Sequence, residues 1–239
     1  GVNSLWLPAP VLKIPVILKP GREDPFTPFR IIQAMIAAGF PAEGFGFYPT
    51  THEGGNTLLF ETGRGVAFGS DKTVKQYAPY RSIQVHGSGR SKVLIGDDFI
   101  DKWEDNLDVI VQSISANGGR SCINASGVLV PKNHDEIGHA LAKKLAAIVP
   151  LERTDPDATV CGFSNPDYAK AIDEMIEDHL KTPGAIDLTA QYREGPRLVE
   201  KYGQTFLSPT LILCEDRDHP LANTEFMFPF ASIVQVPQD

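Results

Sequence analysis

Short apolar stretches alternate with segments in which apolar residues recur every three or four positions. The first stretch, residues 14–18, ends at a Lys-Pro-Gly turn and predicts a buried strand. The next segment, residues 28–38, has helical spacing and stops before Gly39, which favours a helix end. The same pattern predicts further strands over 45–48, 65–70, 82–85, 92–95, 128–130, 210–214 and 232–236, and helices over 71–77, 99–115, 134–147 and 168–180.

The order of these elements determines the fold class. Strands alternate with helices up to residue 85, which is typical of parallel βαβ units. A Gly-Ser-Gly segment at 87–89 then interrupts the pattern, after which strands and helices alternate again. We therefore expect an α/β protein with a division near residues 85–89.

Composition and charge exclude several classes of function. The chain has 239 residues, 42% of them apolar, which is enough for a sizeable core. A net charge of −8 without a basic run argues against a nucleic-acid partner. The longest apolar stretch is interrupted by Pro8, Pro10, Lys13 and Pro15, and no secretory signal begins the sequence, so we expect no membrane span.

The cysteines point to a reducing compartment. Cys122, Cys161 and Cys214 are odd in number and widely spaced, which argues against a disulfide framework and favours the cytoplasm. Cys122 follows the Gly118-Gly119 pair and precedes an apolar run. From this local sequence alone, it is either a small buried hydrophobic residue or a nucleophile on a tight turn.

Two other groups of polar residues give weaker signals. The histidines show no metal-ligand spacing, since His134 and His139 are five residues apart and face different sides of a helix. The acidic cluster at 173–178 is interpreted as a solvated helix face.

Four motifs in a fixed order give the most specific signal. They are Leu18-Lys19-Pro20-Gly21, Phe68-Gly69-Ser70, the cysteine turn at Cys122, and Glu225 four residues before Pro229. Lys19 and Glu225 lie equally far from Cys122 along the chain. In this order and spacing the chain resembles the aldehyde dehydrogenase superfamily over nearly its whole length.

The resemblance implies an architecture. Residues 1–87 would be the second half of a Rossmann-like NAD(P)-binding domain, and residues 88–239 a cysteine-bearing catalytic domain with an incomplete C-terminus. Family members are about twice as long, so the chain is expected to be an internal portion that is inactive alone. The full-length protein is expected to be a homo-oligomer.

The resemblance also implies roles for individual residues. Cys122 would attack an aldehyde to form a thiohemiacetal and then a thioester, with its backbone N–H as one oxyanion donor. Lys19 would bind the adenosine ribose of NAD or NADP, and Gly69 with Ser70 would lie beside the pyrophosphate. Glu225 would hold the nicotinamide ribose.

Departures from the family pattern leave alternatives open. His86 stands where the family usually has the glutamate base for deacylation, so it would be either the base or a sign that coenzyme A accepts the acyl group. Arg22 replaces a ribose-binding glutamate and favours NADP. Arg120 is expected to favour the thiolate of Cys122. Val74 replaces a glycine of the cofactor turn.

Two alternative functions remain open. One is a coenzyme A-acylating dehydrogenase or acyl-CoA reductase, and the other is a catalytically decayed structural homologue.

Overall fold

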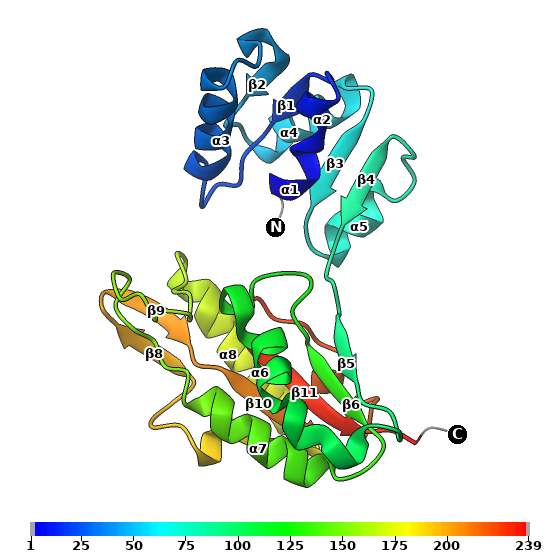
Figure 1. The fold of residues 1–239 in the computed structure, drawn as a ribbon, viewed down its shortest axis with the longest axis vertical. Coiled ribbons are helices and arrows are strands. Elements are labelled where there is room, and N and C mark those ends of the chain that lie inside the picture. Colours follow the sequence, from blue (N-terminus) through cyan, green and yellow to red (C-terminus); the bar gives the residue numbers. More distant parts are fainter. Residues whose placement is uncertain (1–2, 238–239) are drawn as a thin grey trace. The chain divides into compact units, whose positions relative to one another are not determined.

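A computed structural model describes residues 3–237, and the chain divides between Ser88 and Gly89 into two compact units (Figure 1). Both units combine helices with β-sheet, which confirms the α/β prediction. Within the described residues, no helix is both long and apolar enough to cross a bilayer.

The first unit contains two parallel strand pairs. Strand β1 (Val16–Leu18) pairs with β2 (Phe45–Phe47), and the helix α3 (Phe26–Ala37) connects them. Strand β3 (Gly65–Phe68) pairs with β4 (Ile83–His86), and α5 (Asp71–Tyr77) connects them. The predicted βαβ pattern is therefore confirmed. The remaining elements are α1 (Asn3–Trp6), α2 (Pro8–Val11), η1 (Ala42–Gly44) and α4 (His52–Glu61).

The second unit contains most of the buried core of the described chain. Its five-stranded sheet has the order β5-β6-β11-β10-β7, and every neighbouring pair is parallel except β10 with β7. The strands are β5 (Lys92–Leu94), β6 (Gly127–Val130), β7 (Ala185–Asp187), β10 (Thr210–Cys214) and β11 (Phe230–Gln235).

Alternate residues of β10 contact different core clusters. Leu211 and Leu213 belong to the cluster that contains α6 (Leu107–Ser115) and α7 (His134–Ala146). Ile212 and Cys214 belong to the cluster that contains α8 (Pro166–Leu180). All five residues of the strand are buried, as expected for a strand covered on both faces.

The predicted helix over 99–115 is corrected. The structure has a 3-10 segment η2 (Ile100–Asn106), in which Lys102 has a non-helical φ of −120°, followed by α6. In 3-10 geometry, residues i and i+3 lie on one side. Ile100 and Trp103 have this spacing and are both buried, so the packing favours the tighter turn before the helical spacing of α6 begins.

Several elements of the second unit were not predicted from the sequence, among them β7, the hairpin of β8 (Leu198–Lys201) and β9 (Gln204–Leu207), and the short segment η4 (Thr189–Gln191). Tyr202 and Gly203 connect the hairpin with φ values of 50° and 68°. Two positive φ angles are what a two-residue hairpin turn of type I′ needs. The 3-10 segments η3 (Ala116–Gly119) and η5 (Pro220–Ala222) complete the unit.

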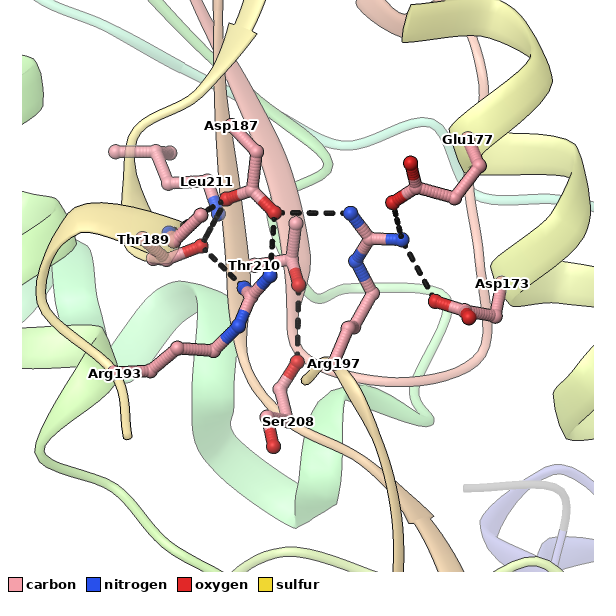
Figure 2. A network of polar contacts seen from close by, with 10 residues as sticks. Asp173, Glu177, Asp187, Thr189, Arg193, Arg197, Ser208, Thr210 and Leu211 are labelled. Carbon is pink, nitrogen blue, oxygen red and sulfur yellow. Dashed lines mark hydrogen bonds and ion pairs between the residues drawn. The ribbon is translucent and has the colours of Figure 1, made fainter. Parts of the chain in front are cut away.

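A buried charge network fixes α8 to β7 and to the start of β8. Arg197 lies between Asp187 on one side and Asp173 and Glu177 on the other (Figure 2). Its distances to these carboxylates are 2.9, 2.7 and 3.1 Å in that order, and Arg193 also binds Asp187 at 2.9 Å. Glu174, Glu177 and Asp178 are exposed, as predicted for a solvated helix face, but Asp173 is half-buried and binds an arginine that lies far away in sequence.

Candidate active site

Cys122 is exposed on a turn between η3 and β6. The three residues Asn117, Gly118 and Gly119 before this turn have φ values of 53°, 64° and 67°. A Cβ at Gly119 would lie 2.3 Å from backbone atoms of Phe228 and Pro229, so only glycine fits there. The absence of a side chain at Gly119 thus allows the turn to pack against the backbone of Phe228 and Pro229, while Cys122 remains exposed.

Asn124 holds the cysteine turn in place through hydrogen bonds of its side chain. Its side-chain oxygen accepts a hydrogen bond from the Ser121 N–H at 2.9 Å. Its amide group donates to the carbonyls of Ser113 and Ala116, both at 3.0 Å. Asn124 is buried, so these bonds form where water does not compete. The side chain therefore ties the cysteine turn to the end of α6.

Replacing Asn124 with alanine is expected to destabilise the second unit by about 2–3 kcal/mol, because the Ser121 N–H and the Ala116 carbonyl lose their side-chain partner. Urea denaturation measures this change. Asn223→Ala is the matched control, since the Asn223 amide also donates to a backbone carbonyl but is exposed. Equal stability losses in the two variants would contradict the role of Asn124 in the turn.

The segment 89–91 packs directly on Cys122. A Cβ at Gly89 would lie 1.7 Å from the carbonyl oxygen of Cys122, so the two backbones touch. Ser91 Oγ donates to the same oxygen at 3.0 Å. Among the described residues, no hydrogen bond uses the backbone N–H of Cys122. The turn is thus held through the carbonyl, and the N–H remains available to a ligand.

Glu225, on the chain segment after η5, contacts the same segment 89–91 that packs on Cys122. Its carboxylate accepts hydrogen bonds from the backbone N–H groups of Gly89, at 3.2 Å, and of Arg90. Arg90 has a φ of 50°, and successive N–H groups near such a left-handed residue form an anion-binding nest. The structure therefore brings Glu225 and Cys122, which are far apart in sequence, onto the same short segment.

Arg120 is bonded to a neighbouring loop. Its guanidinium donates to the carbonyls of Cys161 at 3.2 Å and Gly162 at 2.9 Å. It also stacks 4.5 Å above the ring of Phe163. These contacts give Arg120 a role in bracing the loop at 161–163, which the sequence did not indicate.

The phenylalanines near Glu225 belong to the core. Phe226, Phe228 and Phe230 are all buried, and the rings of Phe226 and Phe230 meet edge to face at 4.8 Å. They pack in the same cluster as α8. The packing of these three rings in the core therefore fixes the position of the segment that carries Glu225.

The other predicted site residues lie in the first unit. Lys19 follows β1, is half-buried, and its side chain lies beside Gly55 of α4. Arg22 is exposed in the turn that follows. Gly69 and Ser70 connect β3 to α5, and the hydroxyl of Ser70, the N-cap residue, makes no capping bond.

His86 and Gly69 are neighbours at the ends of β3 and β4. The Gly69 N–H donates to the His86 carbonyl at 3.0 Å, and the His86 ring stacks on Phe68 with centroids 5.1 Å apart. The buried His86 Nε2 has no hydrogen-bond partner among the described residues. Val74 lies against Gly87, where a Cβ would be 2.5 Å from Val74 Cγ2, so valine fills the space beside this turn.

Comparison with known proteins agrees with the family resemblance. The family model described as "Aldehyde dehydrogenase family" matches residues 6–239. The chain belongs to the aldehyde dehydrogenase family. The cysteine turn and the segment that carries Glu225 lie within the matched residues, and so do all the predicted site residues.

Individual relatives support the aldehyde dehydrogenase fold. Two Staphylococcus epidermidis proteins, named only provisionally as aldehyde dehydrogenases, are each 22% identical over 92% of this chain and 47% of their own length. The aldehyde dehydrogenase KauB from Pseudomonas aeruginosa has a TM-score of 0.81 at 23% identity, over 94% of this chain and 46% of its own. An NAD+ complex of a Mycobacterium tuberculosis aldehyde dehydrogenase has a TM-score of 0.76 at 20% identity, over 94% and 47%. The chain therefore spans about half the length of the relatives it matches.

Several residues around Cys122 were not found from the sequence. Asn124, Gly89 and Ser91 act through contacts with residues distant in the chain, or through a side chain that folds back on the backbone. The one available local signal was an asparagine just after the cysteine in a turn, because asparagine side chains commonly bond nearby backbone groups.

Proposed function

We propose that this aldehyde dehydrogenase family protein oxidises an aldehyde to an acid with NAD or NADP, and that Cys122 is the nucleophile. The observation that carries the proposal is an exposed thiol on a rigid turn whose own N–H is unused by the described residues. A thiol in that position is accessible to a carbonyl carbon, and the N–H beside it can stabilise the oxyanion that forms.

The first step of the proposed reaction takes place at the sulfur atom of Cys122. The Cys122 thiolate attacks the aldehyde carbon, and the carbonyl oxygen becomes an oxyanion next to the backbone N–H. The nicotinamide, when bound, supplies the acceptor for the hydride that leaves the same carbon. Cys122 is then acylated as a thioester. An acceptor molecule must open this bond, which returns the thiol and releases the acid or its acyl derivative.

The residues of the first unit fit a dinucleotide. A Cβ at Gly69 would lie 2.3 Å from Thr73 Oγ1, so the absence of a side chain at Gly69 allows the turn between β3 and α5 to pack closely on Thr73. The exposed Ser70 hydroxyl is not used for capping. In this proposal Lys19 binds the adenosine ribose, Gly69 and Ser70 contact the pyrophosphate, and Glu225 holds the nicotinamide ribose. Arg22 favours NADP, because a guanidinium pairs well with a 2′-phosphate.

Two acceptors are proposed for the acyl group. With water as the acceptor, His86 would act as the base. An alternative is transfer to coenzyme A. The buried Nε2 of His86, which has no hydrogen-bond partner in the part of the chain that the structure describes, supports it, because an enclosed ring nitrogen has poor access to water. Coenzyme A dependence of turnover distinguishes the two.

We further propose that the whole protein is a cytoplasmic homo-oligomer and that the 239-residue chain alone is inactive. The chain spans about half the length of its relatives. Several large apolar side chains of the first unit are exposed, among them Phe29, Phe60 and Phe68, and burying them against a partner would favour an oligomer.

The function is tested on the intact protein with a panel of aldehydes, NAD and NADP, and with or without coenzyme A. We expect aldehyde-dependent reduction of the nucleotide, with NADP preferred. No turnover under any of these conditions would refute the proposal. In that case an unreactive Cys122, unprotected by nucleotide in thiol labelling at neutral pH, would favour a catalytically decayed homologue. Activity of the isolated 239-residue chain would refute the claim that it is inactive alone.

A further inference from the structure

Three consecutive residues before β5 are hydrogen-bonded to both groups on which the proposed hydride transfer depends. The backbone N–H groups of Gly89 and Arg90 donate to the Glu225 carboxylate. The next residue, Ser91, donates its hydroxyl to the Cys122 carbonyl at 3.0 Å. Since the three residues follow one another in the chain, this short segment fixes Glu225 relative to Cys122. All of these residues belong to the second unit.

The backbone of Ser91 is held by Ser126, which is only 3% exposed. Ser126 donates to the Ser91 carbonyl through its N–H at 2.8 Å and through its hydroxyl at 3.3 Å. The Lys92 ammonium donates to the oxygen of the same Ser126 hydroxyl at 2.8 Å. None of these bonds uses the Ser91 hydroxyl, so a variant without that hydroxyl should keep the segment in place.

Two hydrogen bonds hold the peptide planes on either side of the Cys122 Cα. The plane before it is held through the Ser121 carbonyl, which accepts the Asn124 N–H at 2.9 Å. The plane after it is held through the Cys122 carbonyl, which accepts the Ser91 hydroxyl. Gly89 packs against this second carbonyl, but its own N–H is bonded elsewhere. Removing the Ser91 hydroxyl therefore takes a hydrogen bond from the plane that follows the nucleophile.

We propose that Ser91 is a positioning residue whose hydroxyl sets the geometry of hydride transfer from the Cys122 adduct. The inference rests on the proposed roles of Cys122 and Glu225. In this step the C–H electron pair of the thiohemiacetal leaves with the hydrogen for the nicotinamide, and the carbon becomes the thioester carbonyl. If Glu225 holds the nicotinamide ribose, one segment places the hydride acceptor and, through Ser91, the carbon bonded to sulfur. Small misplacements of reacting atoms slow such steps steeply.

Single-turnover nucleotide reduction by the intact protein tests this role, with hydrogen or deuterium at the reacting carbon of the aldehyde to identify the hydride step. Ser91→Ala is expected to slow the isotope-sensitive step roughly tenfold, as a small misalignment of reacting groups would. Ser91→Thr keeps a hydroxyl and is expected to retain most of the rate.

Three other measurements on Ser91→Ala should match the wild type: the dissociation constant for NADPH, the rate of Cys122 alkylation and the melting temperature. Backbone N–H groups bind Glu225, and the thiol is exposed, so neither needs the Ser91 hydroxyl. Ser113→Ala is the matched control. The Ser113 side chain is also half-buried and also donates to a backbone carbonyl, that of Val109, but it does so within α6.

The outcomes separate the role of Ser91 from the proposed reaction. An unchanged hydride step in Ser91→Ala overturns the role of Ser91 and leaves the reaction intact. Equal slowing in Ser91→Ala and Ser91→Thr also overturns it, because the second variant has the hydroxyl. A loss of nucleotide affinity or of alkylation rate as large as the loss of hydride rate shows that Ser91 supports the fold and not the geometry of the step. A wild type that oxidises no aldehyde refutes the proposed reaction and this inference with it.

Discussion

Replacing Cys122 with serine is expected to lower aldehyde oxidation by the intact protein at least about a thousandfold, because the serine hydroxyl is protonated at neutral pH and is a far weaker nucleophile. The exposed turn is held by Asn124 and by the contact with Gly89, and neither depends on the sulfur. The fold should therefore survive the change. Initial rates of nucleotide reduction measure the loss.

Cys161→Ser is the matched control for this prediction. Cys161 is the other exposed cysteine of the second unit, and its carbonyl, not its thiol, binds Arg120. We expect this variant to keep its activity. Thiol alkylation provides a second measure: labelling of the wild type should inactivate it, and nucleotide together with an aldehyde should slow the labelling of Cys122. Wild-type rates in Cys122→Ser would show that another group is the nucleophile.

Replacing Arg197 with methionine is expected to destabilise the second unit by about 3 kcal/mol, because Asp187 and Asp173 lose a charged, hydrogen-bonded partner, although Arg193 still pairs with Asp187. The Arg197 side chain is 2% exposed and that of its partner Asp187 is 7% exposed. Desolvation opposes the charged forms, but the attraction between the partners is larger, so the pKa of Arg197 is raised. Urea denaturation measures the loss of stability.

An exposed ion pair provides the contrast for Arg197. Lys181→Met breaks a pair with Asp178 whose side chains are 77% and 72% exposed. Exposed pairs contribute only about 0–1 kcal/mol, so this variant should be nearly as stable as the wild type. If both variants lost equally little stability, the buried network would not be the connection between α8 and the hairpin that its geometry indicates.

The same network predicts acid sensitivity. Burial raises the pKa of Asp187, but Arg193, Thr189 and Arg197 lower it more, so its folded-state pKa is below the ordinary value of 3.8. A carboxyl with a lowered folded-state pKa stabilises the fold above its unfolded-state pKa. This stabilisation is lost as the pH falls below 3.8 and through the folded-state pKa. Stability in this acidic range should therefore fall less steeply in Asp187→Asn than in the wild type.

Local sequence patterns were sufficient to predict most of the helices and strands. The helix over 71–77 and the strands at 45–48, 92–95 and 210–214 were predicted because apolar spacing and turn residues lie within a few positions of each other. The break at Lys102 was missed because the spacing of Ile100 and Trp103 fits both a 3-10 turn and an α-helix. Only packing against the core distinguishes the two.

The sequence by itself determined the α/β class, the order of the motifs around Cys122 and, through that order, the family. The tertiary structure alone placed Glu225 on the Gly89–Arg90 backbone and Lys92 beside Ser126, and it turned Arg120 toward the loop at 161–163. Periodicity and motifs record interactions between residues near in sequence. The contacts around Cys122 join segments up to 136 positions apart, and they exist only once the sheet has formed.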